Sequence, residues 1–236
     1  MKNYQKNLKL LSENHVYSKE MEHDACGVGL IASTEGKKSR SIVEYGIEAL
    51  KAVWHRGAVD ADGKTGDGAG IHVEIPKDFF VEKIEVTGHD YDNSEICVGM
   101  IFLPRNDYSS QESCKTIVES ELTKNNFSIY GWRQVPVNPK VLGEKALQTM
   151  PEIIQVLFKS NNTNLLDKDL ERKIYETRKR IENKAFNASL NNFYICSISS
   201  KSIIYKGLYL AEAISDFYLD LKDKRFISRY AIFHQR

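Results

Sequence analysis

The amino-acid sequence predicts a layered α+β architecture, in which helices and strands are mixed but do not alternate one by one. Apolar runs of strand length come in adjacent groups, as in residues 192–200 and 202–210. A doubly wound parallel sheet places a helix between successive strands, so this grouping disfavours it. Residues 167–187 carry apolar side chains three or four positions apart, which is the spacing of the buried face of a long amphipathic helix.

The N-terminal elements follow from apolar spacing and turn residues. Residues 26–33 form a short apolar run that ends at a turn-like TEGKKS segment, which predicts a buried strand. Residues 41–56 place apolar side chains at helical intervals and predict a helix. A loop rich in glycine and aspartate follows over 57–70, and the alternation in 71–75 predicts a strand. The apolar run 96–103 predicts another buried strand, which a proline ends.

The same patterns continue to the C-terminus. A helix is expected over about residues 110–125, and the helix over 167–187 begins with aspartates, which its positive N-terminal dipole end favours. Residues 211–221 have a mixed pattern. Further strands are expected over residues 127–135, 152–158, 192–200, 202–210 and 226–236.

Composition excludes several classes of function. The chain has 33 basic and 32 acidic residues and a net charge of +1 at pH 7, so it lacks the excess of positive charge that is typical of nucleic-acid-binding proteins. No segment approaches 18 consecutive apolar residues, so no membrane span is expected. The polar residues 1–24 lack the apolar core of a secretory signal and suggest an irregular leader. Four widely spaced cysteines without a CxxC pair indicate a cytoplasmic protein rather than a disulfide framework.

Two glycine-rich segments match nucleotide-binding motifs only in part. Gly27, Gly29 and Ala32 fit the loose dinucleotide fingerprint, but a charged segment precedes them and a turn-like segment follows. Residues 57–65 have one residue too many between their glycines for a phosphate-binding loop, and a predicted helix rather than a strand precedes them. We therefore expect no nucleotide at either segment.

The loop over 57–70 also offers possible metal ligands. Asp60 and Asp62 could begin a calcium-binding loop, but lysine, threonine and isoleucine stand where further ligands and the turn glycine should follow. His55 and His72 lack the spacing of a dedicated metal site. A hydrogen-bonded turn with solvated carboxylates explains this composition better than a metal does.

Cys26 is the cysteine whose local setting suggests reactivity. It opens a predicted strand, and the small Gly27 beside it lets a substrate approach the backbone closely. If residues 1–25 were removed, Cys26 would carry a free α-amino group with a pKa of about 7.7–8.0 beside a thiol with a pKa of about 8.5. One residue would then supply a nucleophile and a general base. Taken alone, a lone cysteine is more often a small buried hydrophobe.

An ordered series of segments resembles one known family. HDACGVGLIA is similar to the start of the glutaminase domain in glutamate synthase large subunits, which are class II glutamine amidotransferases, and WHRGAVDADGKTGDGAGI is similar to their signature loop. The HRG element occurs across class II amidotransferases, whereas the GDGAG extension and the GWR and PEI blocks point to glutamate synthases. Further blocks recur in the family's order: GWRQVPVN, PEIIQV, ERKIYETRKRIE, SSKSIIYKGL, FYLDL and FHQR.

The resemblance implies an N-terminal nucleophile (Ntn) hydrolase fold, a four-layer αββα sandwich that is incomplete at the C-terminus. Residues 1–25 match a cleaved leader, and residues 26–236 match a truncated glutaminase domain. Cys26 matches the catalytic nucleophile, whose thiolate attacks the side-chain amide of L-glutamine, forms a γ-glutamyl thioester and releases ammonia. Water then converts the thioester to glutamate.

The resemblance also implies residues that bind the substrate. Arg236 matches the arginine that binds the α-carboxylate of glutamine, a task that suits the planar fork of a guanidinium group. His55, Arg56 and Gly57 should lie near the glutamine pocket, although a purely structural turn explains them almost as well. In the family, an Asn-Gly pair forms the oxyanion hole and an aspartate holds the substrate α-amino group, and both lie downstream of the position of Arg236. Because one lost oxyanion donor costs about 100- to 1,000-fold in rate, we expect this chain alone to be inactive or unstable.

Further implications concern the rest of a glutamate synthase. No cofactor is expected in this chain, while FMN and an iron–sulfur cluster are expected in the missing C-terminal part, which uses ammonia and 2-oxoglutarate for glutamate biosynthesis. The expected partners are L-glutamine, the remainder of the large subunit and a small NADPH-oxidising subunit. The alternative is a non-catalytic Ntn-like fragment that acts only as a binding or regulatory module. A related amidotransferase that delivers ammonia elsewhere fits the GWR and PEI blocks less well.

Overall fold

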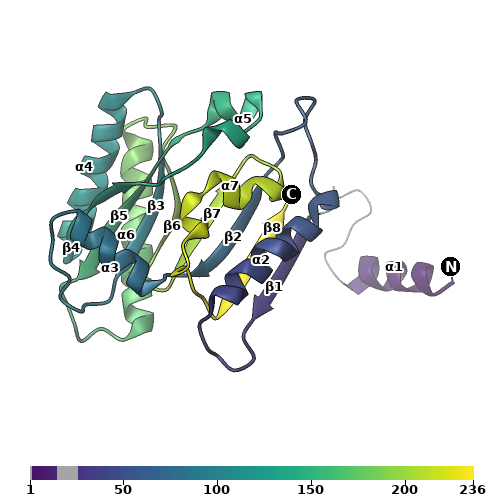
Figure 1. The fold of residues 1–236 in the computed structure, drawn as a ribbon, viewed down its shortest axis with the longest axis horizontal. Helices are drawn as coiled ribbons and strands as arrows, with labels where there is room; N and C mark the ends of the chain where they lie inside the picture. Colours follow the sequence, from purple (N-terminus) through teal and green to yellow (C-terminus); the bar gives the residue numbers. More distant parts are fainter. Residues whose placement is uncertain (1, 15–25) are drawn as a thin grey trace.

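The computed structural model describes residues 2–14 and 26–236, and these residues form two four-stranded antiparallel sheets (Figure 1). The strands of the first sheet lie in the order β1 (Gly27–Ala32), β8 (Tyr230–Gln235), β2 (Ala69–Glu74) and β7 (Ser202–Gly207). The strands of the second sheet lie in the order β4 (Phe127–Gln134), β5 (Glu152–Ser160), β3 (Cys97–Leu103) and β6 (Tyr194–Ser199). β6 and β7 are consecutive along the chain, so the short turn between them links the two sheets.

Helices cover one face of each sheet. α2 (Arg40–Ala52) packs on β1, β8 and β2 of the first sheet. α4 (Tyr108–Lys124) and α6 (Asp167–Asn187) pack side by side on the second sheet, where they contact β3, β4 and β6. The resulting order of helix, sheet, sheet and helix confirms the predicted αββα class, and Figure 1 shows α2 and the α4–α6 pair at opposite sides of the two sheets.

Shorter elements connect these layers. The remaining helices are α1 (Lys2–Asn14), α3 (Lys77–Val86), α5 (Glu144–Thr149) and α7 (Ile214–Phe217). Short 3-10 turns are η1 (Trp54–Arg56), η2 (Pro139–Val141), η3 (Ala211–Ala213) and η4 (Leu219–Lys222). Within the described residues, no helix is long and apolar enough to cross a membrane.

α2 lies unusually close to the first sheet because it contains a glycine at the contact. A Cβ on Gly46 would lie 2.5 Å from the Cβ of Ala231 on β8, which is closer than two such atoms approach. Around this contact, the apolar face of α2 buries Ile42, Val43, Ile47 and Leu50 against the sheet. The close approach fixes the C-terminal end of α2, and the turn that follows it, against the ends of β1 and β8.

The chain builds two apolar clusters, one on each side of the second sheet. The larger cluster joins the buried faces of α2 and the first sheet to Val98 and Met100 on the inner face of β3. The smaller cluster packs α4 and α6 on the other face of the second sheet through residues such as Val118 and Ile174. Alternate side chains of the second sheet therefore pack on the first sheet and on α4 and α6, as expected for stacked layers.

The part of the first sheet that β1 and β8 form is open to water on the face away from α2. Alternation along β1 and β8 directs Val28, Leu30 and Ile232 away from α2, and these side chains are 67%, 61% and 39% exposed. Among the described residues, β1 pairs only with β8 and is an edge strand of its sheet. The strand that begins beside Cys26 is thus packed on one face and exposed on the other.

A buried ion pair connects the second sheet to the first through η4. The guanidinium of Arg133 on β4 donates two hydrogen bonds of 2.8 Å to the carboxylate of Asp220, which is 4% exposed. The Tyr205 hydroxyl on β7 donates to the same carboxylate at 3.0 Å, and Gln155 on β5 accepts from Arg133 at 2.7 Å. Because each charge is met by a partner, this network is buried without an orphaned ion.

Most predicted elements are confirmed. All eight expected strands are present, and α6 has the predicted bounds of 167–187. The predicted helix over 41–56 is wrong at its end, because α2 stops at Ala52 and the chain tightens into the 3-10 turn η1. α3 and α5 were missed, since each is short and lies beside glycine or proline residues that indicate loops.

The expectation of an irregular leader is wrong for its first part. Residues Lys2–Asn14 form the helix α1, since the segment contains lysine, leucine, glutamine and glutamate and lacks glycine and proline. The rest of the expected leader, residues 15–25, lies outside the described part of the chain.

We expect Asp220→Asn to lower the free energy of unfolding by about 3–5 kcal/mol, because it leaves the Arg133 charge buried without its partner. Asp216→Asn is the matched control, since Asp216 forms a 2.7 Å pair with Lys222 that is exposed to water on both sides. That substitution should cost less than about 1 kcal/mol. Urea unfolding monitored by circular dichroism measures both values, and equal costs would contradict the assigned role of the buried network.

Candidate active site

Cys26 and Arg236 meet at one end of the first sheet because β1 and β8 are antiparallel. Gly27, the first residue of β1, pairs with Gln235, the last residue of β8. The next position along each strand is Cys26 on one side and Arg236 on the other. The backbone N–H of Arg236 also donates to the carbonyl of Gly68 at 2.9 Å, which attaches the loop before β2 to the same end.

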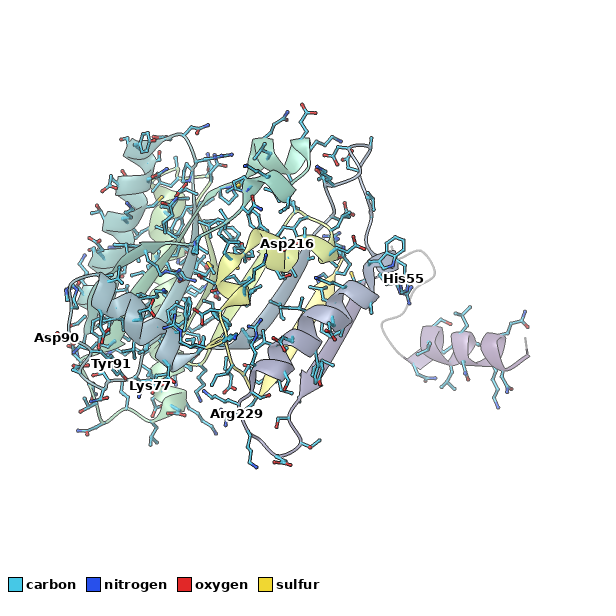
Figure 2. The ribbon with its side chains drawn as sticks, in the orientation of Figure 1. His55, Lys77, Asp90, Tyr91, Asp216 and Arg229 are labelled. Carbon is cyan, nitrogen blue, oxygen red and sulfur yellow. The ribbon has the colours of Figure 1, made fainter. Side chains whose placement is uncertain are left out.

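The HRG turn lies over this end of the sheet. α2 runs back along β1, so η1 and Gly57 come out beside the start of β1. A Cβ on Gly27 would lie 3.2 Å from the Cβ of Arg56, and a Cβ on Gly57 would lie 2.1 Å from Nε2 of Gln235. Figure 2 labels His55 at this end of α2 and Arg229 at the opposite end of the same sheet.

The structure therefore brings together all of the residues that the sequence suggested. Cys26 is half-buried, and the side chains of His55, Arg56 and Arg236 are exposed. Gly57 has the ordinary extended backbone angles φ −89° and ψ 141°, so its small size matters for the contact with Gln235 and not for its conformation.

Cys26 differs from the other three cysteines, all of which the structure describes. Cys97, Cys114 and Cys196 are buried. Burial raises the pKa of the Cys114 thiol to about 11 and that of the Cys196 thiol to about 12. Burial also raises the pKa of the Cys97 thiol far above its usual range. Thiols of this kind are inert at neutral pH, so Cys26 is the candidate nucleophile on accessibility.

The acidic loop between η1 and β2 is a hydrogen-bonded turn. Asp62 accepts from the Thr65 hydroxyl at 2.5 Å and from the backbone N–H groups of Lys64 and Thr65 at 2.9 and 2.7 Å. The hydrogen bond from Thr65, with the two backbone bonds, holds the pKa of Asp62 well below its usual range. Asp60 pairs with Lys145 on α5 at 2.7 Å. In the described residues, no group of three or more His, Cys, Asp or Glu side chains could hold a metal ion.

A pocket of about 460 Å³ opens beside Arg236 on the face of the first sheet opposite α2. Its polar lining includes Asp67, Lys206, His234 and Arg236, and Phe102 reaches into it from the second sheet. Cys26 is not among the lining residues of the pocket. Its volume suits a small molecule that presents both charged and apolar groups.

Gln235 was missed as a candidate although it lies within the FHQR segment. Its side chain is 1% exposed and sits beneath Gly57, on the same face of the sheet as Gly27. A buried amide between two suspected site segments marks a constrained position. A polar residue near the end of a strand is ordinarily expected at the surface, so the burial of Gln235 could not be found without the fold.

One protein family matches most of the chain. Residues 26–236 match the family described as "Glutamine amidotransferases class-II". The chain belongs to that family. The match begins at Cys26 and covers most of the chain, so the residues gathered at the end of the first sheet lie within it.

Curated relatives are glutamate synthases. The chain is 53% identical over 233 residues to a "Glutamate synthase [NADPH] large chain" of Azospirillum brasilense, which covers 99% of this chain and 15% of that protein. It is 41% identical over 217 residues to a "Ferredoxin-dependent glutamate synthase 1, chloroplastic/mitochondrial" of Arabidopsis thaliana, covering 91% of this chain and 13% of that protein. A "Ferredoxin-dependent glutamate synthase 2" of Synechocystis is 37% identical over 216 residues. The chain thus spans about one seventh of the length of these relatives.

We expect Gly57→Ala to destabilise the protein by about 1–3 kcal/mol, because the added methyl group overlaps the buried amide of Gln235. The double variant Gly57→Ala/Gln235→Ala should recover part of the loss, since the second change removes the obstructing atoms. Thermal denaturation of the two single variants and the double variant measures this coupling. Additive losses would show that the two residues do not press on each other.

Proposed function

We propose that this chain carries the glutamine-hydrolysing site of a glutamate synthase, with Cys26 as the nucleophile. The observation that supports this most directly is that Cys26, the HRG turn and Arg236 meet at one end of the first sheet. The family match and the glutamate synthase relatives agree with the chemistry that these residues suggest.

The reaction proceeds in two steps. The sulfur of Cys26 attacks the side-chain carbonyl carbon of glutamine, and its proton passes to the α-amino group of the same residue. As the carbon–nitrogen bond breaks, that proton goes to the departing nitrogen, and ammonia leaves a γ-glutamyl thioester. Water then adds to the thioester carbon, the carbon–sulfur bond breaks, and glutamate and the thiol are released.

This chemistry requires Cys26 to be the first residue of the active protein. Residues 1–25 are therefore the leader, and removal of this segment after Ala25 converts the backbone nitrogen of Cys26 from an amide into a basic amine. The start of the family match at residue 26 supports this boundary. Residues 26–236 belong to the glutaminase domain.

Arg236 binds the α-carboxylate of glutamine. Its position at the end of β8, beside both the cysteine and the pocket, supports this role. A guanidinium group grips a carboxylate through two parallel hydrogen bonds, which fixes the distance from the carboxylate to the reacting amide. His55, Arg56 and Gly57 lie at the same end of the sheet, on the side of α2.

Ammonia from this site is used with 2-oxoglutarate to make glutamate in the remainder of the large subunit. FMN and an iron–sulfur cluster belong to that remainder, which receives its electrons from NADPH through a small subunit, from NADH or from ferredoxin. The four unpaired cysteines support a reducing compartment such as the cytoplasm.

A glutamine-mimicking electrophile should label Cys26 in a protein extended through the downstream oxyanion residues, because the reagent needs an accessible thiol and the adjacent amine. Intact-mass analysis should also show the loss of residues 1–25. Cys114→Ala is the matched control and should still be labelled, because Cys114 is buried away from the site. Persistent labelling and ammonia release in Cys26→Ala would reject the assignment. Glutamine binding without ammonia release from the unmodified protein would indicate a binding or regulatory module.

Arg236→Lys should raise KM for glutamine by about 10- to 100-fold, since lysine keeps the charge but loses one of the two hydrogen bonds to the carboxylate. Steady-state ammonia release over a range of glutamine concentrations measures this effect. Lys224→Ala provides a control for the loss of a positive charge elsewhere on the surface. An unchanged KM in Arg236→Lys would show that another group binds the carboxylate.

A further inference from the structure

One buried polar atom at this end of the sheet has no role in the fold. Oε1 of Gln235 has no hydrogen-bond partner among the residues that the structure describes. The side chain is 1% exposed, so it has almost no contact with bulk water. A buried carbonyl oxygen without a donor is costly, which makes the position unfavourable unless another donor arrives.

The orientation of the Gln235 amide is fixed by its nitrogen. Nε2 donates to the backbone carbonyl of Arg236 at 3.2 Å, so Oε1 is directed away from that carbonyl. The tight contact with Gly57 closes the space on the side of the HRG turn. The Gln235 amide is therefore held between the HRG turn and the adjacent ends of β1 and β8, and its Oε1 remains available as an acceptor.

Removal of the leader would turn the backbone nitrogen of Cys26, close to Gln235, from an amide into an α-amino group. Gly27 pairs directly with Gln235 across the sheet, so Cys26 is the residue next to that pair. Before the leader is removed, this nitrogen is an amide with a single N–H. After removal it is an amine with two or three N–H groups that are free to turn toward an acceptor.

We propose that Gln235 is a positioning residue for the N-terminal amine, with Oε1 accepting a hydrogen bond from the α-amino group of Cys26 once the leader is gone. The inference rests on the proposed function, because it requires Cys26 to be the first residue. The hydrogen bond turns the amine's lone pair toward the thiol and gives Oε1 the donor that it lacks among the described residues. Maturation and active-site geometry are thereby coupled through one residue.

The hydrogen bond also sets the sign of a pH effect. An acceptor beside an ammonium group stabilises the charged form and raises its pKa. Activity that depends on the free amine then appears on the alkaline side of that pKa. The titratable and charged groups on the elements packed around the amine are Lys51 on α2, His55 and Arg56 in the turn, Asp67 before β2, and His234 and Arg236 on β8.

Two substitutions separate positioning from simple packing. Gln235→Met keeps nearly the same length and volume but has no oxygen acceptor, and Gln235→Glu keeps the acceptor and adds a negative charge. In a protein extended through the downstream oxyanion residues, Gln235→Met should lower kcat for ammonia release by about 10- to 100-fold and leave KM within about twofold. The acid limb of its kcat–pH profile should move to lower pH, because the ammonium loses a stabilising acceptor. Gln235→Glu should retain more activity than Gln235→Met and move the same limb to higher pH.

These opposite shifts are the outcome that a structural role cannot give, since loss of packing would lower stability and leave the acid limb in place in both variants. Thermal denaturation and intact mass confirm that each variant is folded and has lost residues 1–25. If Gln235→Glu does not fold, the shift of the acid limb of the kcat–pH profile in Gln235→Met is sufficient to test the inference. An unmoved limb in a folded Gln235→Met, with Cys26→Ala inactive, overturns this inference and leaves the proposed function intact. Activity that survives in Cys26→Ala overturns the proposed function itself.

Discussion

The antiparallel pairing of β1 with β8 is the constraint on which the rest of the site depends. It joins residues more than two hundred positions apart and brings Cys26 beside Arg236 through a ladder of six paired positions. A slip of one residue would turn every side chain of β1 to the other face. Gly29 opposes such a slip, because only glycine leaves room for the Phe233 ring, whose Cζ would lie 2.2 Å from an added Cβ.

The second requirement is that α2 returns along the sheet to the end at which β1 begins. Its contact through Gly46 brings the helix close enough to place the HRG turn over Gly27. The turn then passes into a loop whose shape Asp62 holds by internal hydrogen bonds, and Asp60 fastens that loop to α5. The site is thus assembled by backbone pairing and glycine contacts, while its charged side chains remain exposed to water.

Much of this organisation could be predicted from the sequence, because strands such as 96–103 and the helix over 167–187 carry strong local patterns. The site residues followed from an ordered resemblance, and the fold brings them together. Other features depend on contacts that no local pattern encodes. The 3-10 turn at Trp54–Arg56 ends α2 early within a continuous helical pattern, and the burial of Gln235 depends on a glycine 178 positions earlier in the chain. α1 was missed because a polar segment without a buried face resembles a loop.

The open face of β1 has a practical consequence for handling the protein. Val28 and Leu30 are exposed apolar side chains on an edge strand, whose outer backbone groups have no neighbouring strand among the described residues. Exposed apolar edge strands favour aggregation of molecules through their sheet edges. This chain should therefore aggregate at lower concentration than its near-neutral charge alone would suggest. Leu30→Lys should raise its solubility, and the substitution lies away from the candidate active site.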